Sequence, residues 1–311
     1  MAYIFISNIL HFFMIVLGRD RFSEGLAKEM KAGHVRIESK VFPDGESSFK
    51  ITEPETLKGA KAILVVRGRT PGMNQDKMFT EALFVLDKIK ELGAKKTCLV
   101  MPYIPYARQD KEFTPGEVVS LKSVRAALAS KCDLMVNVTS HDFRHEGWVD
   151  KRVYNIDATL SAADFLKGKG FKKPIVIAPD MTTKGNVEIL AKAIKGETLA
   201  VYKKRDYITG EIQSSAVIPD LTGRELIIFD DITSSGGTMY KAVQMGRKAH
   251  AKKIVCIAVH AISVYNGQFR KDSIDLIRDE SDEYYASDTI ETPVTRFSVI
   301  KQAADFLKKS F

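Results

Sequence analysis

The sequence predicts an α/β protein with two mainly parallel sheets, each flanked by helices. Short β-branched runs alternate along the chain with segments that are apolar at three- and four-residue spacing, a pattern typical of parallel strands joined by helices. A strand-helix-strand pattern also occurs twice in similar form, and glycine-rich polar loops follow apolar runs. The chain has 311 residues, of which 45% are hydrophobic, enough for one large or two ordinary domains.

The elements follow from this spacing in chain order. From Met14 the sequence MIVLGRDRFSEGLAKEM predicts a strand, a glycine turn and an amphipathic helix, a typical start for an α/β domain. The expected strands are 15–17, 63–66, 97–101, 134–138, 175–178, 199–202, 226–229 and 254–259. The expected helices are 76–93, 120–130, 186–196, 239–249 and a last helix within 297–311.

An internal repeat predicts two related domains. Residues 62–104 and 225–262 both run strand, loop, Met-led helix, Ala-Lys-Lys and strand, and the two triplets start 157 residues apart, at 94 and 251. Chance similarity between two ordinary βαβ units is the alternative. The predicted division is an extension or misassigned start at 1–13, domains at 14–157 and 158–296, and a last helix (297–311) that packs back on the body.

The most apolar stretch, residues 3–17, does not resemble a membrane span. It has 15 residues, interrupted by Asn8 and His11, whereas a span needs about 20. No Lys or Arg precedes it to form the first part of a secretion signal. We therefore expect no membrane association.

The charge balance limits the kinds of binding partner that we expect, and the cysteine content indicates the cellular compartment. Lys and Arg exceed Asp and Glu by 47 to 39, which suits phosphorylated small molecules, an acidic membrane or nucleic acid. The basic residues are scattered, whereas nucleic-acid sites concentrate them on one face, so we expect no nucleic-acid partner. Cys98, Cys132 and Cys256 lack the spacing of a zinc or redox motif, and their small odd number fits the reducing cytoplasm.

The segment IIFDDITSSGGTM (227–239) predicts a ribose-phosphate site. Strand 226–229 delivers Asp230 and Asp231 to its carboxyl end, where open α/β sheets bind ligands. Hydroxyls, glycines and a helix amino terminus follow, a combination that binds phosphate. Carboxylates instead accept from sugar hydroxyls or bind a divalent cation. The alternative is an acidic turn before a capped helix. The P-loop and dinucleotide-binding motifs are both missing from the sequence.

This loop resembles the phosphoribosyl-diphosphate-binding signature shared by type I phosphoribosyltransferases and ribose-phosphate diphosphokinases. Further segments favour the diphosphokinase family and occur in its order, covering nearly everything from Met14 onward. They are FPDGES (42–47), PYIPYARQDKEFTPGEVVSLKSV (102–124), APD (178–180), KKR (203–205) and SDTIET (287–292). The resemblance implies two tandem type I phosphoribosyltransferase-like domains, with ATP bound by the first and ribose 5-phosphate by the second.

The resemblance also implies a reaction. The family transfers the diphosphoryl group of MgATP to the C1 hydroxyl of ribose 5-phosphate, and AMP is released. Phosphoryl transfer depends mainly on positioning and on stabilising charge. Lys203 and Arg205 match the family's catalytic pair; by themselves they would be read as solvated residues at a strand end.

Two segments match the family's ATP-binding residues. Arg108, Gln109 and Asp110 follow strand 97–101 and offer planar donors to phosphate or adenine. Phe42, Asp44 and Glu46 lie on a Pro-Asp-Gly turn, where the ring can stack on a purine; turn chemistry alone explains this segment about as well. In the family such segments are often completed across a subunit boundary, so a homo-oligomer, a dimer or a hexamer, is expected.

The remaining binding residues follow from the same resemblance. In the first copy of the repeat, the equivalent loop would guide polyphosphate through Arg67, Arg69, Thr70 and Asn74. Mg²⁺ is the implied cofactor, with His141 and Asp180 as its ligands. The ribose 5-phosphate residues are Asp230, Asp231, Ser234, Ser235, Gly236, Gly237 and Thr238.

Two departures from the family pattern leave alternatives open. The family often has Asp-x-His where this chain has Thr139-Ser140-His141, and Gly-Gly where it has 181–184, with Lys184 as a substitute phosphate ligand. A phosphoribosyltransferase that joins a base to phosphoribosyl diphosphate would share the loop at 230–238. A non-catalytic regulatory relative is the third hypothesis.

Overall fold

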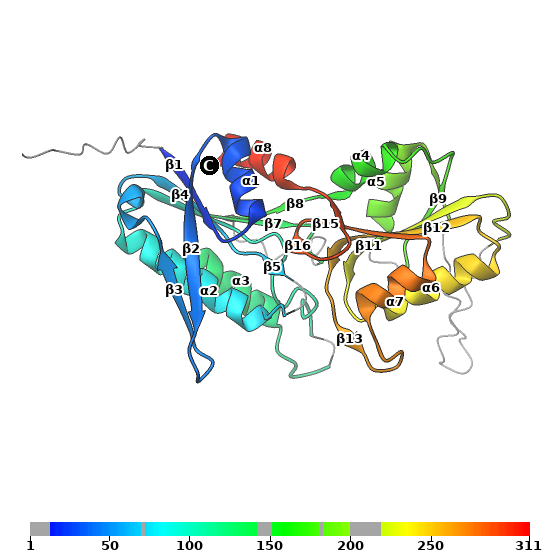
Figure 1. The fold of residues 1–311 in the computed structure, drawn as a ribbon, viewed down its shortest axis with the longest axis horizontal. Helices are drawn as coiled ribbons and strands as arrows, with labels where there is room; N and C mark the ends of the chain where they lie inside the picture. The colour runs from blue at the N-terminus through cyan, green and yellow to red at the C-terminus, as the bar shows by residue number, and fades with distance from the viewer. Residues whose placement is uncertain (1–12, 70–71, 113, 142–150, 181–182, 200–218) are drawn as a thin grey trace, which may run out of the picture.

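The computed structural model describes residues 13–69, 72–112, 114–141, 151–180, 183–199 and 219–311 (Figure 1). Two mainly parallel sheets lie side by side, and helices cover both faces of each. This arrangement confirms the predicted α/β fold class. The domain limits at 157/158 and 296/297 remain a prediction.

The first sheet has the strand order β3-β2-β1-β4-β6-β7-β8, and only β3 runs antiparallel to its neighbour. Its strands are β1 (Met14–Gly18), β2 (Gly33–Val41), β3 (Ser47–Ile51), β4 (Lys61–Val65), β6 (Lys96–Val100), β7 (Leu134–Val138) and β8 (Val153–Ile156). The helices of this half are α1 (Arg21–Met30), α2 (Gln75–Glu91) and α3 (Ser120–Ser130), with a 3₁₀ turn at Pro54–Leu57.

The second sheet is parallel throughout, with the order β10-β9-β11-β12-β15-β17. Its strands are β9 (Ile175–Ile177), β10 (Glu197–Thr198), β11 (Glu225–Thr233), β12 (Lys253–Ala261), β15 (Glu283–Ser287) and β17 (Thr295–Phe297). Its helices are α4 (Thr159–Lys167), α5 (Lys184–Ile194), α6 (Gly237–Lys248) and α7 (Ser273–Glu280), and α8 (Ile300–Ser310) ends the chain. Two small ribbons complete the fold: β13 (Tyr265–Asn266) with β14 (Lys271–Asp272), and β5 (Gly68–Arg69) with β16 (Ile290–Glu291).

The hydrophobic core joins the two halves. One continuous cluster of buried side chains runs along the side of both sheets that carries α1, α4, α5 and α8. A second cluster lies between the first sheet and helices α2 and α3, and a third between the second sheet and helices α6 and α7. Because the first cluster contains residues of both sheets, burial of apolar surface stabilises the contact between the halves. It also stabilises the fold of each half.

The repeat seen in the sequence corresponds to two parallel βαβ units. Strands β4 and β6 pair in parallel around α2, and β11 and β12 pair in parallel around α6. The Ala-Lys-Lys triplets lie at equivalent places, since β6 begins at Lys96 and β12 at Lys253. The loops that precede α2 and α6 are therefore equivalent in the two halves.

Several predicted boundaries were wrong. Strand β11 continues through Asp230 and Asp231 to Thr233, because its partner β12 is equally long and pairs with it as far as Ala261. Helix α6 begins two residues earlier than expected, at Gly237. In place of a strand at 199–202 the structure has β10 at Glu197–Thr198, and residues 200–202 lie outside the described part.

The apolar segment near the amino terminus enters the core. Met14–Gly18 forms β1, which lies between β2 and β4 and is buried from Ile15 onward. Residues 1–12 lie outside the described part of the chain. Among the described residues, no helix has both the length and the apolar character that a membrane crossing requires.

Candidate functional site

A cavity of about 370 Å³ lies where the two halves meet, at the carboxyl ends of strands from both sheets. The second half contributes the end of β11, the loop after it and the start of α6. The first half contributes the loops that follow β6 and β7. The lining residues are Arg108, Asp110, Lys111, His141, Asp180 and the continuous segment 230–239. We call this the first cavity.

The loop 234–238 presents backbone to the first cavity. The helix start at Gly237 has no side-chain cap, and a Cβ atom built at Gly237 would meet no atom within 4 Å. Gly236 has a φ of 77°, which favours glycine. Asn266 fixes the loop by donating from Nδ2 to the carbonyl of Ser235 at 2.7 Å. An uncapped helix amino terminus beside open space is suited to bind an anion.

Asp231 contacts a histidine from the other half. Its Oδ2 atom lies 2.8 Å from Nδ1 of His141, and its Oδ1 atom accepts from the N–H of Ile232 at 2.7 Å. Burial acts to raise the pKa of Asp231, but the hydrogen bond from His141 and that from Ile232 outweigh it and lower the pKa. The hydrogen bond to Asp231 likewise raises the pKa of His141. The carboxylate is thus held charged and oriented toward the cavity that it lines.

The environment of Asp230 raises its pKa, whereas that of Asp231 lowers it. Only 6% of its surface is exposed, and burial, followed by the charges of Asp231 and Asp180, raises its pKa well above the ordinary value. Three carboxyl groups therefore affect one another at one end of the cavity. Such an excess of negative charge in a buried place favours the approach of a cation or of hydroxyl donors.

The predicted metal ligands both line the first cavity. His141 follows β7 and Asp180 follows β9. No three His, Cys, Asp or Glu side chains of the described residues lie close enough together to hold a metal ion by themselves. Mg²⁺ is usually held by one or two carboxylates together with substrate phosphates and water. The donor chemistry of Asp180 and its acidic neighbours suits that ion, although the oxygen preference of Mg²⁺ makes His141 the weaker candidate.

The expected ATP residues are divided between two places. Arg108 and Asp110 line the first cavity, as does Lys111, which the sequence analysis quoted within YARQDK but did not single out. Gln109 does not line it, and its buried Nε2 atom has no hydrogen-bond partner among the described residues. The basic residues Arg108 and Lys111 bring positive charge to the cavity from the first half, whereas the acidic pair of β11 comes from the second.

Phe42, Asp44 and Glu46 lie elsewhere, on the turn between β2 and β3. This hairpin projects from the body of the molecule (Figure 1), and none of the three residues lines the first cavity. The turn is closed by the N–H of Phe42, which donates to the carbonyl of Glu46 at 2.8 Å, and Asp44 accepts from the N–H of Glu46. The Phe42 ring remains 40% exposed. Within one chain, Phe42, Asp44 and Glu46 therefore do not join Arg108 and Asp110, the residues of the predicted ATP site that line the first cavity.

The two departures from the family pattern have local structural explanations. The Thr139 hydroxyl is buried and accepts from the N–H of Ala158 at 2.9 Å, so Thr139 joins the end of β7 to the segment before α4. Lys184 begins α5 with an exposed side chain 3.9 Å from Glu188, and it does not line the first cavity. Residues 181–182 lie outside the described part.

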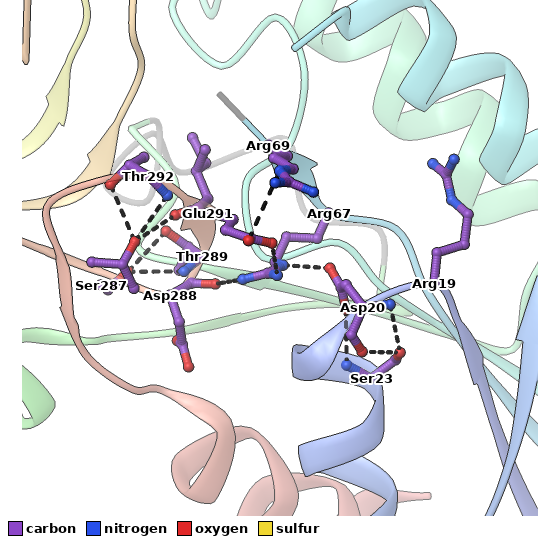
Figure 2. Close-up of polar contacts among 12 residues, drawn as sticks. Arg19, Asp20, Ser23, Arg67, Arg69, Ser287, Asp288, Thr289, Glu291 and Thr292 are labelled. Carbon is purple, nitrogen blue, oxygen red and sulfur yellow. Dashed lines mark hydrogen bonds and ion pairs between the residues drawn. The ribbon is translucent and has the colours of Figure 1, made fainter. Parts of the chain in front are cut away.

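Arg67 and Arg69 line a second cavity, of about 290 Å³, and not the first. Asn74 also lines it, and Thr70 lies outside the described residues. Figure 2 shows Arg67 between carboxylates of the two halves. Its guanidinium donates to Asp20 at 2.6 Å and to Glu291 at 3.0 Å, and its side chain is only 5% exposed. These contacts engage Arg67 within the protein, which does not favour its expected role as a polyphosphate guide.

The predicted catalytic pair, Lys203 and Arg205, lies outside the described residues. The three cysteines are buried and unbridged. Ile232 and Met239 also line the first cavity, although the sequence analysis gave them no role in the site. Ile232 lies on the extension of β11, which the apolar run 226–229 did not predict, and Met239 lies in the first turn of α6.

Comparison with family models gives two matches. Residues 14–131 match the model described as the N-terminal domain of ribose phosphate pyrophosphokinase. Residues 152–289 match the phosphoribosyl transferase domain model. The two matches follow one another along the chain and correspond to the two halves of the repeat.

Comparison with individual proteins gives similarity over nearly the whole chain. A ribose-phosphate pyrophosphokinase of Sulfolobus acidocaldarius is 33% identical over 303 residues, covering 95% of this chain and 100% of the relative. One from Pyrococcus furiosus is 32% identical, covering 94% of this chain and 100% of the relative. In fold, the chain resembles phosphoribosylpyrophosphate synthetase from Mycobacterium smegmatis, with a TM-score of 0.78, 22% identity, and coverage of 95% and 97% of the two chains.

Proposed function

This chain belongs to the ribose-phosphate pyrophosphokinase family, and we propose that it transfers the diphosphoryl group of MgATP to the C1 hydroxyl of ribose 5-phosphate. The observation that carries the proposal is the composition of the first cavity. Carboxylates and an uncapped helix start from one half meet basic side chains from the other half within about 370 Å³. A sugar phosphate and a polyphosphate therefore find complementary groups in one place.

The second half binds ribose 5-phosphate. The phosphate is held by the loop 234–238, whose N–H groups and hydroxyls lie at the start of α6. The sugar hydroxyls donate to Asp230 and Asp231. Each carboxylate oxygen has two lone pairs, so Asp231 can still accept from a hydroxyl while it is bonded to His141 and to the Ile232 N–H.

The first half supplies positive charge for the polyphosphate of ATP. Arg108 and Lys111 line the same cavity as the ribose-binding residues, and so does Asp110. Lys203 and Arg205 stabilise the charge that develops on the migrating group, as their match to the family motif implies. We propose the cytoplasm as the place of this reaction, because the chain has few cysteines and its substrates are phosphorylated.

Mg²⁺ is the proposed cofactor, with Asp180 and His141 as the residues that hold it. When bound, it neutralises charge on the phosphates and makes the transferred phosphorus more electrophilic. The chain's own contribution is a group of carboxylates, Asp180, Asp230 and Asp231, whose mutual repulsion is relieved when a cation approaches. The hydrogen bond between Nδ1 of His141 and Asp231 keeps the imidazole at the edge of this group.

We also propose a homo-oligomer, a dimer or a hexamer, in which the hairpin tip of a second copy completes the ATP site. Phe42, Asp44 and Glu46 do not line the first cavity of their own chain, and the hairpin of β2 and β3 that carries them projects from the body (Figure 1). A ring that is 40% exposed, next to the exposed Val41, is available for contact with another chain.

One assay of products tests the proposed reaction. The purified protein is incubated with MgATP and ribose 5-phosphate, and AMP is measured by a coupled enzyme reaction. Release of AMP is expected. Release of pyrophosphate from phosphoribosyl diphosphate in the presence of a base would instead indicate a phosphoribosyltransferase. A lack of AMP from the chain alone, with stimulation of an active relative, would indicate a regulatory subunit.

Filling the space beside Gly237 should block ribose 5-phosphate. In Gly237→Val the new side chain extends into the open space of the first cavity without meeting other protein atoms. We expect the KM for ribose 5-phosphate to rise about 100-fold, the equivalent of about 3 kcal/mol, with little change in thermal stability. The measurement is steady-state kinetics with a thermal unfolding curve. The matched control is Gly168→Val at the end of α4, where φ is −71° and an added Cβ would make only ordinary contact. An unchanged KM in Gly237→Val would contradict the phosphate position.

A further inference from the structure

A buried histidine, His260, joins the two halves without lining either of the two cavities described above. It lies near the end of β12 in the second half, and only 1% of its surface is exposed. Its Nε2 atom lies 2.9 Å from the carbonyl oxygen of Val138, the last residue of β7 in the first half. Its ring packs edge-on against Tyr103, also of the first half, with 5.1 Å between the ring centroids. Because burial of an unpaired polar group costs free energy, both ring nitrogens of His260 need partners.

The surroundings of His260 determine which ring nitrogen carries the proton. A carbonyl oxygen only accepts, so Nε2 carries hydrogen and donates to Val138. Burial lowers the pKa of His260 to about 4, so the ring is neutral at neutral pH and its Nδ1 atom accepts. The hydroxyl of Thr289, in the segment SDTIET, lies 2.8 Å from Nδ1 and donates to it. This hydroxyl also lies near the Val259 carbonyl, but Ser287 donates to that carbonyl at 2.6 Å and leaves the Thr289 proton for His260.

Two neighbouring strands of the second half hold the segment that carries His141. On β12, His260 is the register partner of Ile232 on β11, which directly follows Asp231. His260 binds the carbonyl of Val138, and Asp231 binds the imidazole of His141 three residues later. The segment is thus attached to the second half at both of its ends. A single attachment would leave the segment free to pivot, whereas two attachments fix its orientation as well as its position.

The backbone between these two attachments is strained. Thr139 has a φ of 40°, in the left-handed region that β-branched residues rarely adopt. Such a conformation persists only where the surrounding structure imposes it, and it is most often found at functional sites. The N–H of Thr139 donates to the carbonyl of Ile156 at 2.7 Å, and its hydroxyl accepts from the N–H of Ala158. The strained residue directly follows the carbonyl that His260 binds, so loss of the His260 bond would allow the backbone there to relax.

We propose that His260 is a positioning residue, whose Nε2–H fixes the carbonyl of Val138 and thereby keeps His141 against Asp231 in the first cavity. Thr289 supports this role because it holds His260 in the tautomer that donates to Val138. The importance of the contact for catalysis rests on the proposed function of the first cavity. The contact itself is present in the free protein, where it can be measured without any reaction.

Two amide variants of His260 separate the bond between the halves from the bond within the second half. In His260→Gln, the amide nitrogen takes the place of Nε2 and donates to Val138. In His260→Asn, the amide is one methylene shorter and reaches only the place of Nδ1, beside Thr289. Both variants lose the ring contact with Tyr103. A second pair tests the tautomer: Thr289→Val removes the hydroxyl and nearly keeps the shape, whereas Thr289→Ser keeps the hydroxyl. Thermal unfolding verifies that each variant is folded.

Nitrogen NMR of the free protein gives a readout that does not require activity. The Asp231 carboxylate only accepts, so Nδ1 of His141 carries the proton that joins them. The ¹⁵N chemical shift of this nitrogen reports the contact, and Asp231→Ala gives the reference value for its loss. We expect His260→Asn to move the shift toward the Asp231→Ala value and His260→Gln to keep it. His34, which contacts Ser23 within the first half, is the internal control.

Kinetics of AMP formation give the second readout. We expect His260→Asn to lower kcat at least about tenfold, because displacement of positioned groups slows a reaction that depends mainly on positioning. The KM for ATP should stay within about threefold, since the nucleotide-binding residues are unchanged. His260→Gln should keep kcat within about threefold of the unchanged protein.

An unchanged kcat or an unchanged His141 shift in His260→Asn overturns the proposal. Equal losses in His260→Asn and His260→Gln also overturn it, because a purely structural role does not depend on the place of the amide nitrogen. If the unchanged protein forms no AMP but the shift moves only in His260→Asn, the positioning role stands and the proposed function fails. If His260→Asn does not fold, the second pair decides: a loss only in Thr289→Val supports the proposal, and equal behaviour of Thr289→Val and Thr289→Ser overturns it.

Discussion

Replacing Lys203 with alanine should lower kcat by about 10³-fold and leave the affinity for ATP within about threefold of the unchanged protein. A cation that neutralises charge developing during transfer acts mainly in the transition state, so its loss affects turnover more than ground-state binding. The measurements are steady-state kinetics of AMP formation and titration of the protein with a non-hydrolysable ATP analogue.

The neighbouring Lys204 provides the matched control. Lys204→Ala removes the same charge from the same segment, but the resemblance assigns it no role, so we expect a change of less than about threefold in kcat. Equal losses in Lys203→Ala and Lys204→Ala would indicate a general electrostatic effect and contradict the specific role. An equal loss of ATP affinity and of rate in Lys203→Ala would show that the residue binds the ground state.

Replacing Asp231 with alanine should raise the KM for ribose 5-phosphate by about 100-fold. Hydrogen bonds to charged groups contribute about 1.5–3 kcal/mol each, and two sugar hydroxyls donating to this carboxylate would lose them together. The KM for ATP should change by less than about threefold, because the nucleotide is held by the other half. Initial rates with each substrate varied in turn give both constants.

Asp164→Ala, at an exposed position on α4, is the control for the loss of one carboxylate. His141 loses its partner in Asp231→Ala, so the pKa of His141 should fall; titration of the imidazole by NMR detects this in the free protein. An unchanged KM for ribose 5-phosphate together with a lowered His141 pKa would mean that Asp231 orients His141 and does not bind the sugar.

Much of the fold could be predicted because it depends on local pattern. Buried parallel strands such as β9, Ile175–Ile177, are continuous apolar runs, and α3 has the helical spacing over its full length, 120–130. The hairpin of β2 and β3 was missed. Most of its side chains are exposed or half-exposed, so its sequence lacks the apolar run that marks a central strand. The same reason applies to the short edge strand β10, which is exposed.

The site was predictable to the extent that it is continuous in sequence. The segment 230–238 carries its carboxylates, hydroxyls and glycines within nine residues, so residue chemistry alone indicated a sugar phosphate. Lys111 gave only a weak signal, a single lysine in a polar loop. No pattern in the sequence indicated the partners of Arg67, since Asp20 and Glu291 are 47 and 224 residues away from it.

The sequence by itself determined most of the buried central strands and most of the helices, where the phosphate loop lies and which family the motifs resemble, because each depends on residues close together in the chain. Only the tertiary structure decided that His141 meets Asp231, 90 residues away, that Phe42 stays apart from Arg108, and that the equivalent loops of the two halves line separate cavities. These contacts depend on strand order and on the shared core between the sheets. Both arise from the burial of apolar surface over the whole chain, which no local pattern specifies.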